Sequence, residues 1–268
     1  MKRWVAIGTA ALWLAAAAIP AAAADGRFEI NQSCVAAGCF PGDAPGFPID
    51  TQEAASYVLT SNLVVPDANT RAVTLAASAV LDLNGFSISG STTCTGTPVT
   101  SCSGTGTGDG VYAEDFATIR NGAIRKMGHY GIAGNGGVSV ESMVVEQNGS
   151  FGLFFNYSND GPEANLVRDS RIARNGGAGV QESGGGGGIG TLITGSVFYG
   201  NKDAGVQGFN VHVTNNTFAR NGSVGISGST AAVGGNTFLY NNGGNDQPQT
   251  GPIVQISPNF CGADTTCP

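Results

Sequence analysis

The sequence has few basic residues and almost no histidine. Lys and Arg number 12 against 19 Asp and Glu among 268 residues, the formal net charge is −7, and only two histidines occur. A chain without a basic patch does not favour nucleic acid as a partner, because binding to phosphates needs clustered cations. His129 and His212 lie four turns apart in the repeat described below, so we expect them at the surface and not in a shared metal or catalytic site.

Several enzyme motifs are also missing. No GxSxG, HExxH or phosphate-binding GK[ST] pattern occurs. The glycine run Gly184–Gly188 is followed by neither Lys-Ser/Thr nor a helical pattern, so it predicts a loop and not a phosphate cradle. After residue 24, no apolar run approaches the roughly 20 residues that a membrane-spanning helix needs.

The first 24 residues fit a secretory signal peptide. A basic start ending at Arg3 is followed by the apolar run Trp4–Ile19, by Pro20, and by small residues before Asp25. We therefore expect an exported protein, periplasmic or extracellular, with no membrane span after signal cleavage. A retained membrane anchor is the alternative, but the apolar run is short for a span.

The six cysteines fall in three close pairs, Cys34/Cys39, Cys94/Cys102 and Cys261/Cys267. An export signal and an even count favour disulfides. A metal site is the alternative, but no histidine lies near any pair and no pair has CxxC spacing. In an elongated solenoid the two chain ends lie many turns apart, so we expect each cysteine to pair with its near neighbour.

Glycine is abundant, at 43 residues, and its recurrence reveals a repeat. An asparagine recurs every 20 to 27 residues, at Asn148, Asn175, Asn201, Asn221 and Asn241, and Met127 holds the same place in an earlier unit. Three apolar columns and one glycine column keep a constant offset from this anchor. The columns are Ile119, Val140, Val167, Ile193, Val213 and Val233; Ile124, Val145, Ile172, Phe198, Phe218 and Phe238; Ile132, Leu153, Val180, Val206 and Ile226; and Gly131, Gly152, Gly179, Gly205 and Gly225.

This pattern predicts three short strands per unit, each burying one apolar residue against the next unit. The fold class is therefore all-β: a single-stranded right-handed parallel β-helix of about seven three-strand turns, with about 4.8 Å between turns. We expect the anchor asparagine to adopt left-handed backbone at one corner and each column glycine to supply positive φ at another. A leucine-rich repeat is the alternative, but its LxxLxL frame is absent.

The repeat also gives the boundaries. We expect a signal peptide at 1–24, an N-terminal cap at 25–55, the β-helix at 56–250 and a C-terminal tail or cap at 251–268, in a monomer. Leu83–Ile88 aligns with Ile119–Ile124, and an insertion follows between Ser91 and Gly108. Two further excursions fall near Asn156–Ala164 and Glu182–Gly190, where the unit spacing is longest.

The segments Ser56–Asn62, Val65–Asn69 and Leu81–Gly90, with Asp82–Gly85 inside the last, resemble bacterial right-handed parallel β-helix repeat proteins, as does the closing Asn259–Pro268. Those proteins belong to the pectate-lyase-like (pectin lyase fold) superfamily. The resemblance covers nearly all of the chain after the signal peptide and implies the fold. It leaves the activity open, because the superfamily holds lyases, hydrolases, epimerases and adhesins.

One outward face suits contact with carbohydrate. The residues after each column glycine place amides, hydroxyls and aromatic rings on the same side of successive turns, without aligned carboxylates. The candidates for carbohydrate binding are Phe154, Asn156, Tyr157, Gln181, Gln207 and Phe209. An ordinary polar strand face with stacked amides is the alternative.

Charges gather on other faces. Arg120, Glu141 and Arg168 share one column, and their alternating signs favour a ladder of surface ion pairs. The resemblance implies that a lyase would use a Lys or Arg base and carboxylates that hold Ca²⁺. The candidate bases are Arg168, Arg171 and Arg174, and the candidate Ca²⁺ ligands are Asp160 and Glu163; no other cofactor is indicated.

The preferred reading is an exported β-helix that contacts polysaccharide or the cell surface without strong catalysis. Whether the chain is an enzyme stays open at this stage. One alternative is a polysaccharide lyase or glycoside hydrolase acting on acidic polysaccharide, and another is a structural or adhesin-type solenoid.

Overall fold

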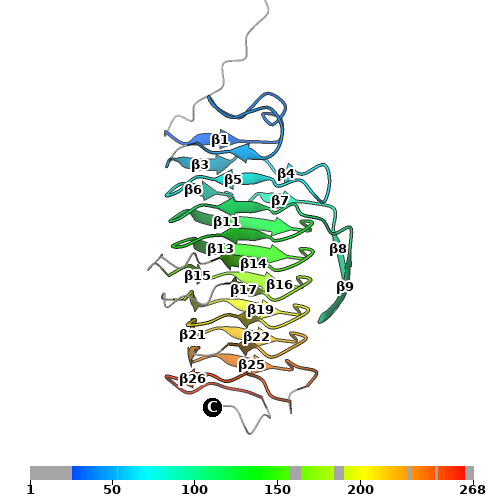
Figure 1. The fold of residues 1–268 in the computed structure, drawn as a ribbon, viewed down its shortest axis with the longest axis vertical. Helices are drawn as coiled ribbons and strands as arrows, with labels where there is room; N and C mark the ends of the chain where they lie inside the picture. Colours follow the sequence, from blue (N-terminus) through cyan, green and yellow to red (C-terminus); the bar gives the residue numbers. More distant parts are fainter. Residues whose placement is uncertain are drawn as a thin grey trace, which may run out of the picture.

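The structure is a computed structural model. It describes residues 26–52, 54–156, 164–183, 190–228, 231–244 and 247–262. Within these ranges the chain winds into a stack of flat turns along one axis, with the N-terminal turns at the top of Figure 1. The expected signal peptide and most of the two excursions lie outside the described residues. None of the described ranges contains a helix long and apolar enough to cross a bilayer.

Each turn contributes up to three strands, which stack in parallel into three walls. The first wall contains β1 (Phe28–Ile30), β3 (Ser56–Leu59), β6 (Val80–Asp82), β11 (Thr118–Arg125), β13 (Ser139–Glu146), β15 (Leu166–Arg168), β18 (Leu192–Thr194), β21 (His212–Thr214), β24 (Ala232–Gly234) and β26 (Val254–Gln255). The second wall contains β4 (Leu63–Val64), β7 (Ser87–Ser89), the second halves of β11 and β13, β16 (Arg171–Ala173), β19 (Val197–Tyr199), β22 (Thr217–Ala219) and β25 (Thr237–Leu239).

The third wall is a separate sheet of eight strands, one for each turn. It contains β2 (Ile49–Asp50), β5 (Val73–Leu75), β10 (Val111–Ala113), β12 (Ile132–Gly134), β14 (Leu153–Asn156), β17 (Val180–Ser183), β20 (Val206–Gln207) and β23 (Ile226–Ser227). The three-strand parallel β-helix is thus confirmed, and its eight turns are close to the seven expected.

The three apolar columns are confirmed residue by residue. Ile119, Val140, Val167, Ile193, Val213 and Val233 pair in unbroken register along the first wall. The columns that begin at Ile124 and Ile132 do the same along the second and third walls. Every member of the three columns is at most 1% exposed, so together they form the core.

The anchor asparagines form a buried ladder at the corner between the second and third walls. Each side-chain amide nitrogen donates to the side-chain oxygen of the next asparagine, from Asn148 to Asn241, at 2.9–3.0 Å. The last rung is Gln249, whose Oε1 accepts from Asn241 Nδ2 at 3.1 Å. Because these amides are fully buried, the ladder satisfies polar groups that would otherwise destabilise the fold.

A second ladder, which the sequence reading missed, lies at the corner between the first and second walls. Ser170 and Ser196 begin it, and Asn216 and Asn236 continue it toward Asn259. In each rung the side-chain oxygen accepts the backbone N–H of the corresponding residue one turn earlier. Hydroxyl and amide residues share this column, so no single residue type marks it in the sequence.

The expectation about the corner backbone was wrong in detail. The anchor asparagines are not in the left-handed region; the residue before each of them is, as at Gln147 (φ 59°), Arg174 (φ 55°) and Arg220 (φ 54°). The left-handed residue makes the bend, and the asparagine after it points its amide into the stack. The corner therefore tolerates long charged side chains, which project outward from the bend.

The explanation of the glycine column was also wrong. Those glycines do not have positive φ; they are needed because the turns approach too closely for a Cβ. A Cβ on Gly179 would lie 2.5 Å from the carbonyl oxygen of Gly205, and one on Gly205 would lie 2.5 Å from the Phe218 ring. The column marks close packing beside the ladder and not a special turn.

The alignment of Leu83 with Ile119 was shifted by two residues. Leu81 is the residue that pairs with Ile119, while Ile88 pairs with Ile124 as expected. The extra residues form a bend at Asn84 (φ 50°) and Gly85 (φ 81°), where Asp82 accepts the Asn84 N–H. Leu83 remains fully buried beside this bend.

The insertion is a β-hairpin of β8 (Thr93–Gly96) and β9 (Val99–Ser103). The Cys94–Cys102 disulfide joins its strands, as expected. The hairpin lies along the flank of several turns (Figure 1), and Val99 donates its N–H to Gly200 of a later turn at 3.0 Å. It therefore fastens turns that are far apart in sequence.

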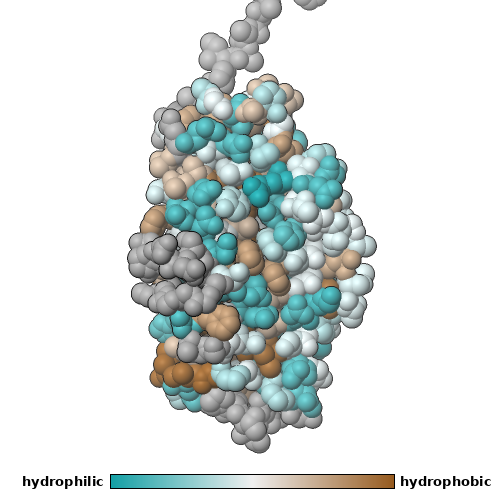
Figure 2. Space-filling view, in the orientation of Figure 1, coloured by the Kyte–Doolittle hydropathy of each residue, from teal (hydrophilic) through white to brown (hydrophobic). Residues whose placement is uncertain are grey.

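The two ends differ. At the N-terminal end the Cys34–Cys39 disulfide closes a loop whose Phe40 packs against Phe28 and Tyr57, with ring centroids 5.2–5.4 Å apart. At the C-terminal end Val254, Ile256 and Phe260 are each more than half exposed, and Figure 2 shows hydrophobic surface near β26. Cys261 is disulfide-bonded, and its expected partner Cys267 lies outside the described residues.

Candidate functional site

The outer face of the third wall carries the side chains that the sequence proposed for carbohydrate contact. Its outward column runs in register through Tyr112, Ala133, Phe154, Gln181, Gln207 and Ser227. Because strands in a sheet are about 4.8 Å apart, this column places one side chain per step along the solenoid axis. The described residues form at least two hollows on this face.

The first hollow, of about 320 Å³, lies on strands β10, β12 and β14. It is lined by Arg71, Thr107, Asp109, Tyr112, His129, Tyr130, Ala133, Gly134, Asn135, Phe154 and Asn156. Arg71 lies just before β5, and Asp109 lies just before β10. His129 and Tyr130 lie just before β12. The hollow is thus built at the corner where the chain enters three successive strands.

Asp109 organises the charged side of this hollow. Its carboxylate Oδ1 lies 3.0 Å from His129 Nδ1 and accepts the Tyr130 backbone N–H at 3.2 Å. Its Oδ2 accepts from Arg71 Nη2 at 3.4 Å. The carboxylate is only 6% exposed, whereas the histidine and arginine side chains remain more than a third exposed. One buried anion therefore holds a histidine and an arginine at the same opening.

Aromatic rings form the other side. Tyr130 stacks on Phe154 with centroids 4.7 Å apart and planes 12° apart, and Phe151 continues the stack at 5.6 Å from Tyr130. The His129 ring lies 3.5 Å from that of Tyr130, and the Arg71 guanidinium lies 4.6 Å above the Tyr112 ring. The rings give the hollow a flat apolar surface next to its charged groups.

Burial raises the pKa of Tyr130, and the negative charge of Asp109 raises it further. The Tyr130 hydroxyl therefore loses its proton less readily than that of an exposed tyrosine. Nearby, the Tyr112 hydroxyl donates to Asn135 Oδ1 at 3.4 Å, and Asn135 Nδ2 donates to Glu114 at 3.2 Å.

The second hollow, of about 330 Å³, lies further along the same wall. Its lining includes Gln181, Gln207, Phe209, Ser227 and Pro252. Its lining among the described residues holds amides, a hydroxyl and one exposed ring, with no charged side chain. Close below it, Glu182 is buried and accepts the backbone N–H groups of Thr191 and Phe209, so this carboxylate supports the wall.

The predicted carbohydrate-binding residues divide between these hollows. Phe154 and Asn156 line the first, and Gln181, Gln207 and Phe209 line the second. Tyr157 lies outside the described residues, as do the candidate Ca²⁺ ligands Asp160 and Glu163. Across the parts of the chain that the structure describes, no three His, Cys, Asp or Glu side chains gather as a metal site requires.

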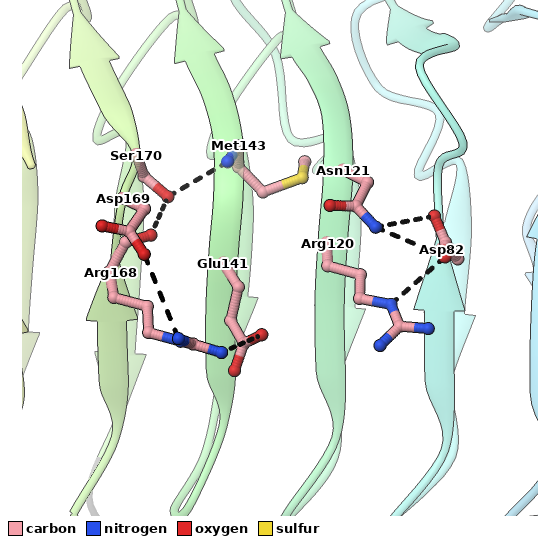
Figure 3. Close-up of polar contacts among 8 residues, drawn as sticks. All are labelled: Asp82, Arg120, Asn121, Glu141, Met143, Arg168, Asp169 and Ser170. Carbon is pink, nitrogen blue, oxygen red and sulfur yellow. Dashed lines mark hydrogen bonds and ion pairs between the residues drawn. The ribbon is translucent and has the colours of Figure 1, made fainter.

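The candidate bases lie elsewhere. Arg168 is on the first wall and donates to Glu141 at 2.9 Å, while Arg171 on the second wall donates to Glu146 at 2.7 Å. Figure 3 shows the ladder on the first wall, where Arg120 donates to Asp82 and Arg168 to Glu141. The hydrogen bond from Arg168 to Glu141 raises the pKa of Arg168, which is unsuited to a general base.

Arg174, the third candidate, is the left-handed corner residue before Asn175. Its side chain lies beside Gly200, near the tip of the hairpin. None of the three arginines lines either hollow of the third wall. The structure thus places the expected carbohydrate face and the expected bases on different sides of the solenoid.

The sequence reading missed Arg71, Asp109, His129 and Tyr130 as one group. A signal was present in the column just before the glycines, which reads Tyr130, Phe151, Ala178, Ala204 and Val224. The aromatic residues occur only in its first two units, whose strands β12 and β14 border the hollow. Asp109 holds the same place before Gly110 in the preceding turn.

Comparison with known proteins identifies the repeat. The family model "Right handed beta helix region" matches residues 67–209. Among curated proteins, none matches the chain. Among solved structures, the A-module of Azotobacter vinelandii mannuronan C-5 epimerase AlgE6 is similar at 15% identity and a TM-score of 0.47, over 86% of this chain and 69% of that one. The A-module of AlgE4 from the same organism is similar at 14% identity and a TM-score of 0.47, over 88% and 79%.

Proposed function

The chain belongs to the right-handed β-helix family, and from this premise we propose that it is an exported protein that binds polysaccharide along its third wall. The observation that carries the proposal is the stacked pair Tyr130 and Phe154 at the edge of a hollow with polar groups. Sugar rings present C–H faces that pack on aromatic rings and hydroxyls that bond to amides and carboxylates. The disulfides of the chain fit an oxidising compartment.

The wall also suits a polymer better than a single sugar. The two hollows share one outward column, and Phe154 and Gln207 are two strand steps apart, or about 10 Å along the axis. A linear chain lying along the axis would contact both hollows at once, which raises its affinity through effective concentration. We assign the contacts to Phe154, Asn156, Gln181, Gln207 and Phe209, with Tyr130 added from the structure.

Affinity electrophoresis and calorimetry with neutral and uronate polysaccharides would test the proposal. We expect Phe154→Ala to weaken binding about tenfold, the effect of losing one stacking ring. Phe260→Ala is the matched control, because Phe260 is an exposed phenylalanine on the last turn and away from both hollows. The absence of binding to every polymer, or equal loss in both variants, would overturn the proposal.

A further inference from the structure

Cations gather at the corner between the second and third walls, although the sequence has no run of three basic residues. Some occupy the left-handed bend before an anchor position, and the others lie next to that bend. The winding of the chain brings them together from four of five successive turns. The six cations, which we call the corner ridge, are Arg125, Lys126, Arg171, Arg174, Lys202 and Arg220.

The corner ridge is straight and evenly spaced. Lys126, Arg174 and Arg220 are left-handed corner residues of alternate turns, and Gln147 and Gly200 hold the same place in the turns between them. The backbone N–H of each corner residue donates to a carbonyl of the next turn, so the bends stack directly on one another. With about 4.8 Å between turns, these three cations are about 10 Å apart along the axis.

Most of the positive charge of the ridge is not neutralised. Arg125 and Arg171 share Glu146, at 3.9 and 2.7 Å. Among the described residues the other four ridge cations form no ion pair. With Glu146 and Asp203, the two carboxylates along this corner, the ridge has a net charge of +4 in a chain whose net charge is −7. Such a concentration of one sign of charge favours an anionic partner.

The hairpin beside the ridge adds no charge of its own. Residues 91–108 contain no Asp, Glu, Lys or Arg, and the hairpin follows this flank of the solenoid in Figure 1. Its tip lies against the corner, because a Cβ on Gly200 would be 3.2 Å from Thr97 Cγ2. The exposed hydroxyls of Thr95 and Ser101 lie 3.2 Å apart on its strands. The hairpin therefore offers polar contacts without repelling an anion.

The shape of the ridge favours a flat partner over a polymer that needs a groove. The ridge is a convex edge, and its cations line neither hollow of the third wall. The last corner residue, Tyr240, is 51% exposed, and the Arg220 guanidinium lies 5.3 Å from its ring centroid. Tyrosine and arginine side chains, with an apolar body and a polar tip, are suited to the boundary between a bilayer and water.

From these features we infer that the corner ridge docks the protein on the surface of an anionic phospholipid bilayer, with the solenoid axis parallel to that surface. Each Lys or Arg near such a surface strengthens binding roughly fivefold, and a cluster of about four to eight is typical of peripheral docking. At about 0.15 M salt, charges more than about 8 Å away are largely screened, so carboxylates on the other walls do not prevent docking. Docking by the ridge does not depend on polysaccharide binding along the third wall.

Sedimentation with vesicles tests the docking. The purified protein, without its expected signal peptide, is mixed with vesicles of equal parts phosphatidylglycerol and phosphatidylcholine, or with vesicles of phosphatidylcholine alone. We expect at least about tenfold tighter binding to the anionic vesicles, and we expect that binding to weaken as salt is added. Equal binding to both kinds of vesicle, or no binding to the anionic ones, would overturn the inference.

Paired variants test whether the ridge is the docking surface. Lys126→Gln with Arg220→Gln should weaken binding to the anionic vesicles about 20-fold, because two exposed corner cations are lost. Arg120→Gln with Arg168→Gln is the matched control, because it removes the same charge from the first wall. The control should change the affinity by less than about twofold. Equal losses in the two variants would mean that net charge alone matters, and the ridge would not be the docking surface.

A soluble polyanion is the competing occupant. Affinity electrophoresis with polygalacturonate distinguishes it from a bilayer, because we expect the polymer to retard the ridge variant as much as it retards the unaltered protein. Retardation that is lost in the ridge variant and kept in the first-wall control would assign the ridge to a polymer and overturn the inference. If no polysaccharide binds any variant while anionic vesicles still do, the proposed function falls and the docking stands.

Discussion

The turns from β5 to β14 and the turns from β18 to β25 share the same repeat but differ in how regular they are. In the later turns the unit length settles at 20 residues, and Phe198, Phe218 and Phe238 stack with centroids 4.8 and 5.0 Å apart. The earlier turns carry the hairpin insertion, the charged ladder of the first wall and the Asp109 hollow. Residues that recur from turn to turn therefore stabilise the solenoid. Residues that do not recur are free to form a functional site.

The largest expected effect comes from the centre of the regular stack. Phe218→Ala should lower the free energy of unfolding by about 4 kcal/mol, because it leaves a cavity between two rings in a core that cannot collapse around it. Chemical denaturation with circular dichroism measures this. Phe154→Ala, on the outer face of an earlier turn, should change stability by less than about 1 kcal/mol. Equal losses in the two variants would contradict the division between scaffold and site.

The asparagine ladder gives the next effect. Asn221→Ala should destabilise the protein by about 3 kcal/mol, because the backbone N–H and side-chain amide of Asn201 both lose their buried acceptor. Lys202→Ala, at the exposed residue that follows Asn201, is the control and should have little effect. Thermal melts of both variants would decide the matter, and a near-neutral Asn221→Ala would show that the ladder is dispensable.

A smaller effect is expected at the glycine column. Gly179→Ala should cost about 2 kcal/mol, because the added Cβ would meet the Gly205 carbonyl 2.5 Å away. Gly251→Ala is the matched control: a Cβ there would find its nearest neighbours at 3.5 Å, and the backbone is not left-handed. If Gly179→Ala were as stable as Gly251→Ala, close approach would not explain the column.

The smallest effect is expected in the charged ladder of the first wall. Arg168→Ala should cost less than about 1 kcal/mol, because the Arg168–Glu141 pair is exposed and screened by salt. A double-mutant cycle with Glu141→Ala should give a coupling of about 0.5 kcal/mol that falls as salt is added. A coupling several times larger would mean that the first wall depends on its charges for stability.

The sequence predicted the fold residue by residue, but it did not predict the group of residues in the first hollow. Val140 and Val213 were assigned to one wall because an apolar residue recurs at the same offset in every turn, as a buried column requires. Tyr130 and Asp109 had no such support, since neither side chain recurs in the later turns. The group is assembled by the winding of the chain, which brings residues some 20 positions apart to one opening.

The errors in the prediction have a common cause. The register of Leu83 depended on a bend at Asn84 and Gly85, and the role of the glycine column depended on contacts between turns. Both depend on how closely neighbouring turns approach each other, which the residue types alone do not determine. The ion pair of Arg168 with Glu141 was foreseen as one interpretation of a charge column, whereas that of Arg171 with Glu146 was not.

The hydrogen bonds of the amide ladder all run toward the C-terminal end, so turns could be added without breaking the pattern. Each asparagine receives from the turn before it and donates to the turn after it, so an added 20-residue turn would find a ready donor above and a ready acceptor below. Gln249 ends the series because its longer side chain folds back, and its amide nitrogen donates to the carbonyls of Gly244 and Gln247. The length of the third wall is thus set by how many turns precede a single glutamine.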